Sequence, residues 1–177
     1  MQNNDLSRFK TTIIFTTTAL ASDLQDYLIG KYPGIPEEQR PWVVNHSKKE
    51  EIDKEDIFCR TAINHPHRIR LIITTTCMLM GINVPNADIV INLGLMSNLS
   101  DGVQALGRVG RRDGRSDNTR PCGLMYNILN ASDMAQHTEQ SVKDFMNTDQ
   151  CLTYYLERHF GWSENLNKCM RCSNCFC

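Results

Sequence analysis

Two segments in which apolar and polar residues do not alternate, at residues 70–75 and 88–93, restrict the possible folds of this chain more than any other feature. A strand with one face in the core alternates apolar and polar side chains, whereas a strand buried on both faces is apolar almost throughout. Strands buried on both faces occur in parallel sheets that helices cover on both sides. The two runs therefore predict an α/β fold built on a parallel sheet.

The rest of the chain alternates between strand and helix patterns. We expect further strands at residues 11–17, 42–45 and 122–128, and helices at residues 19–30, 48–62, 97–106, 132–146 and 149–160. Strands that alternate with helices form parallel βαβ units, and ligands bind such sheets at the carboxyl ends of the strands. The turns after Thr75, Leu93 and Leu106 are therefore the expected places for chemistry.

Apolar side chains at helical spacing predict which helix faces enter the core. The first helix should bury a stripe made of Leu20, Leu24, Tyr27 and Leu28, and the second should bury Ile52, Phe58 and Ala62. Gly30 is placed to end the first helix. Cys59, Cys77 and Cys122 lie in apolar stretches and are also expected in the core.

The composition of the chain limits the kinds of partner that it can bind. The chain has 177 residues, of which 41% are hydrophobic, enough for one substantial core. A net charge of −1 gives no global basic field, so any contact with nucleic acid must be local. No apolar run approaches the length of a membrane span, so we expect no membrane partner.

The last nine residues carry cysteines at C-x-x-C-x-x-C spacing, and a further cysteine lies upstream. A C-x-x-C turn places two sulfurs on one edge of a metal ion, and Zn²⁺ binds four such ligands at tetrahedral positions. The predicted zinc ligands are Cys151, Cys169, Cys172 and Cys175. Cys177 is an alternative to Cys175. A bound zinc ion would stabilise a tail that is too small for a core of its own.

A disulfide framework is the alternative explanation for eight cysteines. The polar residues that follow Met1 do not resemble a secretory signal, and no apolar segment comes after them. We therefore expect an intracellular location, in which thiols stay reduced and a metal site is favoured over disulfides.

The pattern Q-x-x-G-R-x-G-R spans Gln104 to Arg111. Its glycines, including Gly107, let the backbone approach a ligand closely, and Arg108 and Arg111 can each donate paired hydrogen bonds to phosphate oxygens. An arginine aimed at a γ-phosphate stabilises the charge of the transition state in phosphoryl transfer. A solvated basic loop is the alternative interpretation.

A second motif, Met80-Gly-Ile-Asn-Val-Pro-Asn86, follows the strand at residues 70–75. Together the two motifs resemble motifs V and VI of superfamily 2 helicases, and more narrowly those of the RecQ family. The run from Cys151 to Gly161 resembles the zinc-domain helix of that family. Two substitutions depart from the family pattern: Leu79 replaces a motif V glycine, and Ala105 replaces a motif VI glutamate.

The resemblance implies a RecA-like second lobe at residues 1–130 and a helical zinc-binding domain at residues 131–177. It implies that Gln104, Gly107, Arg108 and Arg111 bind ATP, with the two arginines in the catalytic role. It also implies that Thr75, Gly81 and Asn83 contact the single DNA strand along which a 3′–5′ helicase moves.

The chain has neither the G-x-x-x-x-G-K-[ST] nor the D-E-x-H pattern that holds ATP and Mg²⁺ in such helicases. The resemblance places both in a first RecA-like lobe, which becomes the expected protein partner. We expect this polypeptide alone to lack ATPase activity. The alternative function is a non-enzymatic zinc module that binds nucleic acid or protein, and an RNA-directed relative is also compatible with motifs V and VI.

Overall fold

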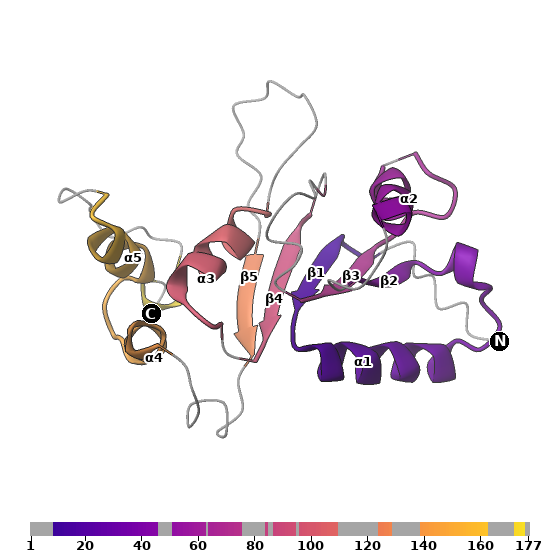
Figure 1. Ribbon diagram of the computed structural model, residues 1–177. Coiled ribbons are helices and arrows are strands. Elements are labelled where there is room, and N and C mark those ends of the chain that lie inside the picture. The colour runs from indigo at the N-terminus through magenta and orange to yellow at the C-terminus, as the bar shows by residue number, and fades with distance from the viewer. Residues whose placement is uncertain are drawn as a thin grey trace.

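The computed structural model describes residues 9–45, 51–62, 64–75, 84, 87–94, 96–109, 124–128, 139–162 and 172–175. Five parallel strands form one sheet in the order β2-β3-β1-β4-β5 (Figure 1). The strands are β1 (Thr12–Phe15), β2 (Trp42–Asn45), β3 (Leu71–Thr74), β4 (Ile89–Leu93) and β5 (Leu124–Ile128). The predicted parallel α/β sheet is confirmed, although most of its strands are shorter than expected.

The central strands form the sheet because both of their faces are apolar. β1 pairs in parallel with β3, Ile13 opposite Ile72, and with β4, Ile13 opposite Val90. These three side chains are at most 1% exposed. Burying each of them stabilises the fold by about 1.5–3 kcal/mol, measured against an exposed side chain.

Helices cover both faces of the sheet. On one face, Ala21 of α1 (Thr18–Lys31) packs with Val44 and Ile73. On the other, Ile57 of α2 (Glu51–Thr61) and Ala105 of α3 (Leu99–Leu106) join one cluster with the central strands. A short 3-10 turn, η2 (Glu37–Gln39), precedes β2.

Two C-terminal helices, α4 (Gln140–Asn147) and α5 (Leu152–Phe160), pack beside α3 (Figure 1). Their shared apolar cluster is built on Leu99, Val142 and Phe145, all buried. Since Leu99 begins α3, this cluster joins the C-terminal helices to the sheet domain. Within the described part of the chain, no helix is both long and apolar enough to cross a membrane.

Several predictions about helix faces were wrong. Leu20 and Tyr27 are 39% and 60% exposed, because the buried stripe of α1 is narrow and centred on Ala21, with Leu24 and Leu28 partly buried. Gly30 lies inside α1, and Tyr32 caps the helix instead.

Among the described side chains of α2, Ile57 and Thr61 are buried, whereas Cys59 is exposed, as is Ala62 just after the helix. Two residues along a helix correspond to roughly 200°, so Cys59 lies on the face opposite Ile57. The side chains of Ile52 and Phe58, and all of Cys77 and Cys122, lie outside the described residues.

Candidate metal centre and predicted nucleotide-binding residues

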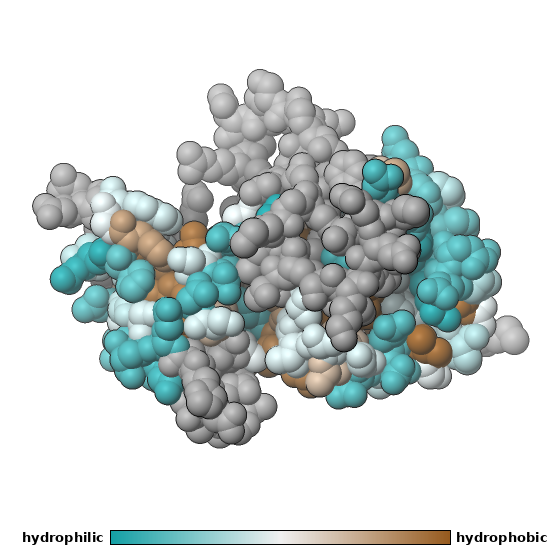
Figure 2. All heavy atoms as spheres, viewed as in Figure 1, coloured by the Kyte–Doolittle hydropathy of each residue, from teal (hydrophilic) through white to brown (hydrophobic). Residues whose placement is uncertain are grey.

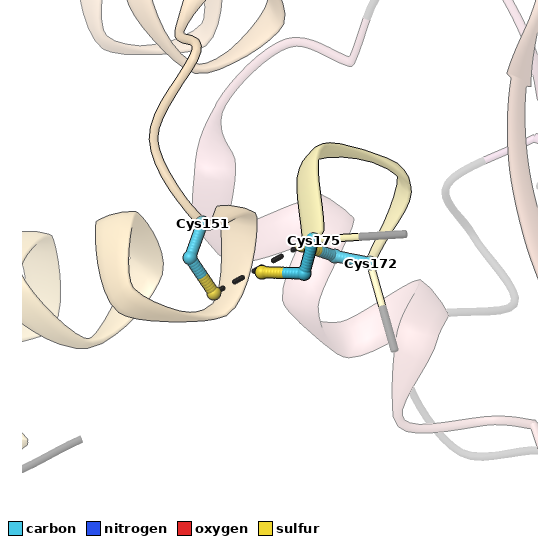
Figure 3. A group of neighbouring side chains, drawn as sticks. All are labelled: Cys151, Cys172 and Cys175. Atoms are coloured by element: carbon cyan, nitrogen blue, oxygen red, sulfur yellow. Dashed lines mark hydrogen bonds between the residues drawn. The ribbon is translucent and has the colours of Figure 1, made fainter. Parts of the chain in front are cut away.

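Three of the predicted zinc ligands converge on one point (Figure 3). Cys151 immediately precedes α5, Cys172 immediately precedes the 3-10 turn η5 (Ser173–Cys175), and Cys175 is the last residue of that turn. Their three sulfur atoms all lie within 4.8 Å of one another. The sulfurs of Cys151 and Cys172 are 3.9 Å apart.

This spacing fits a metal ion better than a disulfide. Two sulfurs bound to one tetrahedral zinc ion lie about 3.8 Å apart, because each Zn–S bond is about 2.3 Å long. A disulfide bond is about 2.05 Å long, far shorter than the 3.9 Å between Cys151 and Cys172. The donor set of three thiols at this spacing therefore suits zinc. The fourth predicted ligand, Cys169, lies outside the described residues, and so does Cys177, the alternative to Cys175.

Hydrogen bonds hold the cysteine turn against the start of α5. The side-chain nitrogen of Asn174 donates to the backbone oxygens of Thr148 and Gln150, at 2.6 and 2.8 Å. The backbone nitrogen of Leu152 donates to the Cys172 sulfur at 3.4 Å. Asn174 was not singled out in the sequence; the available signal was an amide side chain inside the C-x-x-C turn.

The helix that carries Cys151 is fixed from its other side. The Tyr155 ring lies 5.6 Å from the Phe145 ring, centre to centre, and its hydroxyl donates to the Ser141 backbone oxygen at 3.3 Å. Burial and then the nearby Asp144 carboxylate raise the pKa of the Tyr155 hydroxyl. The hydroxyl therefore stays protonated at neutral pH and remains a donor.

The described part of the arginine motif, residues 104–109, lies at the end of α3. Asn98 caps the start of this helix by accepting a 2.8 Å hydrogen bond from the backbone of Asp101. At the other end, Gln104 and Gly107 are exposed and Arg108 is half-buried. The backbone nitrogen of Arg108 donates to the Ala105 oxygen at 3.0 Å, so a helical turn carries the chain to this residue.

Gly102 explains how α3 packs. A Cβ atom added at this buried glycine would collide with the sulfur of Met96. Met96 in turn packs against the cluster that holds α4 and α5. The missing side chain therefore makes room for a contact between α3 and the C-terminal helices.

The remaining predicted residues divide between described and undescribed segments. Thr75 follows β3 at its carboxyl end, and its backbone nitrogen donates to the Asn45 oxygen at 3.4 Å. Gly81, Asn83 and Arg111 lie outside the described residues. The structure therefore brings three cysteines together, and it places Thr75 and Arg108 on separate elements.

One expectation about position was wrong. We expected the turn after Leu106 at the carboxyl edge of the sheet, together with the turn after Thr75. Figure 1 shows α3 running from the arrowhead end of β4 and β5 back toward the end at which β5 begins. A crossover helix must return in this way because it leads into the next parallel strand.

A family model described as the helicase conserved C-terminal domain matches residues 3–113. This chain belongs to that helicase family. The match contains the sheet up to β4, all of α3 and the arginine motif from Gln104 to Arg111.

Two curated relatives indicate which group of helicases this chain resembles. ATP-dependent DNA helicase Q1 of Mus musculus is 26% identical over 141 residues, which are 73% of this chain and 21% of that protein. ATP-dependent DNA helicase Q-like SIM of Arabidopsis thaliana is 28% identical over 124 residues, or 63% of this chain and 14% of that protein. Both are RecQ-family helicases, which confirms the resemblance found in the sequence. The chain thus spans about a fifth or less of the length of these relatives.

A solved structure shows the same fold. Domain 2 of the DEAD-box helicase Mss116p, bound to an RNA duplex, superposes with a TM-score of 0.55 at 18% identity. The superposition covers 80% of this chain and 49% of the other. The predicted RecA-like sheet flanked by helices is therefore confirmed for this helicase C-terminal domain.

Proposed function

We propose that this helicase C-terminal domain is the second motor lobe of a RecQ-type, ATP-dependent 3′–5′ DNA helicase. The observation that carries the proposal is the exposed end of α3, where the arginine motif begins. Gln104 and Gly107 are exposed there, and Leu106 remains 42% exposed although it is apolar. Such a surface suits a partner that covers it, and we assign that role to a first RecA-like lobe.

In this proposal, ATP and Mg²⁺ bind between the two lobes. Gln104, Gly107, Arg108 and Arg111 contribute contacts to the nucleotide from this side. The two guanidinium groups stabilise negative charge that develops on the transferred phosphoryl group. When bound, Mg²⁺ neutralises charge on the phosphate oxygens, while the residues of this chain orient and hold them.

Thr75, Gly81 and Asn83 contact the single DNA strand along which the motor moves. The position of Thr75 supports this assignment, because it follows β3 at the carboxyl edge of the sheet, where parallel folds bind ligands. Since the net charge is −1, DNA binding depends on these local contacts. We place the protein in the nucleus, where its DNA substrate lies.

Residues 131–177 form a zinc-binding domain in this proposal. Cys151, Cys169, Cys172 and Cys175 hold the ion, which has a structural role. The spacing of the three described sulfurs supports it. The ion adds folding energy to a segment whose helix α5 has no fully buried side chain of its own.

The proposal is tested by measuring how this chain associates with a separately expressed first lobe of a RecQ-type helicase. A non-hydrolysable ATP analogue should strengthen the association, measured by calorimetry. Arg108→Ala should reduce this analogue-dependent increase in affinity by about tenfold or more, because it deletes charged hydrogen bonds to phosphate. Lys31→Ala removes an exposed cation from α1 and should change nothing. A gain that both variants retain in full would contradict the proposal.

A second candidate is a non-enzymatic zinc module that binds nucleic acid or protein. It is favoured by Ala105, which is 2% exposed in the apolar core where the family motif carries a glutamate. The loss of that carboxylate removes a group that can position the motif VI arginines. Zinc and DNA binding without any nucleotide-dependent association of lobes would support this second candidate.

A further inference from the structure

A tryptophan side chain at the end of α5 is largely exposed to solvent. Trp162 is 61% exposed, and it stacks on Phe160 with ring centres 4.9 Å apart and planes 20° from parallel. One face of the indole is therefore supported by Phe160. Most of the exposed area must then belong to the opposite face and the edges of the ring.

The backbone holds the indole in this place. Gly161 adopts a left-handed conformation with φ of 68°, which ends α5. The backbone nitrogen of Trp162 donates to the Glu157 oxygen at 2.9 Å, and that of Gly161 donates to the Arg158 oxygen at 3.3 Å. These two bonds form a Schellman motif, which fixes the direction of the chain at Trp162.

Phe160 is itself anchored. It packs against the apolar cluster of Leu99, Val142 and Phe145, and the His159 ring lies nearly perpendicular to it, with ring centres 4.9 Å apart. Trp162 is therefore an exposed aromatic surface on a rigid support. Its side-chain entropy is already reduced by the stacking, which lowers the entropic cost of binding a second ring.

The neighbours of Trp162 favour a nucleobase over an apolar protein surface. Arg158, His159 and Gly161 are all exposed around the last turn of α5, whereas the acidic Glu157 is half-buried, so the most exposed part of the described surface here is polar and basic apart from the indole. The Arg158 guanidinium lies 5.8 Å from the centre of the Tyr154 ring. Exposed aromatic rings next to cations are the usual elements of sites for single-stranded nucleic acid.

We propose that Trp162, supported by Phe160, is a stacking site for an unpaired base of single-stranded nucleic acid, with Arg158 contacting the adjacent phosphate. This inference rests on the proposed function, because it adds a contact to the strand that the motor is proposed to hold. Base stacking requires only a flat π-face, so the site accepts any sequence.

Intrinsic fluorescence of the zinc-loaded chain tests the inference. The chain has two tryptophans, and Trp42 is only 5% exposed, so quenching by a ligand reports mainly on Trp162. We expect quenching by an oligothymidylate of about 15 nucleotides, a length sufficient for such sites. An abasic oligomer of equal length and charge should not quench. Oligouridylate distinguishes an RNA preference from a DNA preference.

Matched variants supply the second measurement. Trp162→Ala should weaken oligothymidylate binding by roughly fivefold or more, as expected for the loss of one stacked base. Trp162→Phe should restore part of the affinity, because it keeps an aromatic face. Tyr27→Ala removes a comparably exposed aromatic side chain, 60% exposed, from α1 and should leave the affinity unchanged.

Three results would overturn the inference. The first is quenching by the abasic oligomer equal to that by oligothymidylate, which would indicate phosphate contacts alone. The second is a Trp162→Ala variant that retains the wild-type melting temperature and full affinity. The third is a wild-type chain that binds none of the oligomers, and only this result would also count against the proposed DNA contacts of the motor lobe.

Discussion

At the scale of single residues, Asn174 shows how an uncharged side chain can shape a candidate metal centre. Its amide bridges the cysteine turn to two backbone oxygens, of Thr148 and Gln150, that precede α5. Both Cys151 and Cys172 depend on the relative position of these segments. Groups of this kind, just outside the ligands, tune metal affinity by holding the ligands in place.

We predict that Asn174→Ala weakens zinc binding by about 10–100-fold, as measured by competition with a chromogenic chelator. The physical reason is that the sulfur positions are no longer fixed before the metal binds. Asn147→Ala, which removes an exposed amide from α4, is the matched control and should leave the affinity unchanged. Equal zinc affinities in the two variants would show that Asn174 does not position the ligands.

At the scale of helices and strands, two glycines show that residue type alone does not determine where a helix ends. Gly30 lies inside α1, and nothing lies within 4 Å of a Cβ atom built there. Gly161 also has open space, but its φ of 68° is one that other residues rarely adopt. Glycine thus lies within the helix α1, whereas the same residue type ends the helix α5.

We predict opposite effects on stability for alanine at these two positions. Gly30→Ala should raise the free energy of unfolding by about 0.5–1 kcal/mol, because alanine favours a helix interior. Gly161→Ala should lower it by about 1–2 kcal/mol, because it places a Cβ in a left-handed conformation. Thermal unfolding of the two variants measures both. Shifts of the same sign would mean that backbone conformation does not control these sites.

Much of the fold could be predicted from the sequence because strand patterns are local. The strand at Trp42–Asn45 has the predicted bounds, and the two segments without alternation, at residues 70–75 and 88–93, contain β3 and β4. Helix faces were less predictable, because a stripe can rotate to suit its neighbours. Cys59 was expected in the core and is exposed, since Ile57 occupies the buried side of α2.

The candidate site could be predicted where the spacing of residues in the sequence is typical of a metal site. Cys151, Cys172 and Cys175 were found from their spacing, and they converge. Asn174 was not found, because its role depends on contacts with residues 24 and 26 positions earlier. The roles of Arg111, Gly81, Asn83 and Cys169 stay predictions.

At the scale of the whole molecule, one apolar cluster joins the sheet domain to the C-terminal helices. Leu99 of α3 contributes to it, and so do Val142 and Phe145 of α4. The helix that begins next to the cysteine cluster packs on the same residues. Loss of the metal should therefore destabilise the C-terminal helices first and the sheet only indirectly.

We predict one zinc ion per chain by elemental analysis of freshly purified, reduced protein. Chelation should lower the melting temperature and the helical signal in circular dichroism, because metal binding contributes to folding. Cys172→Ser should reproduce the effect of chelation, whereas Cys59→Ser, in an exposed position on α2, should retain the metal. Zinc well below one ion per chain in the wild type would contradict the proposed metal centre.

The central claim is that Arg108 and Arg111 serve an ATP site whose other half lies on a first lobe. DNA-dependent ATP turnover by an equimolar mixture of this chain and that lobe tests it most directly. We predict no turnover by the chain alone, turnover by the mixture, and a loss of about 10³-fold or more with Arg108→Ala or Arg111→Ala. Turnover by the mixture that is unchanged in both arginine variants would contradict the claim.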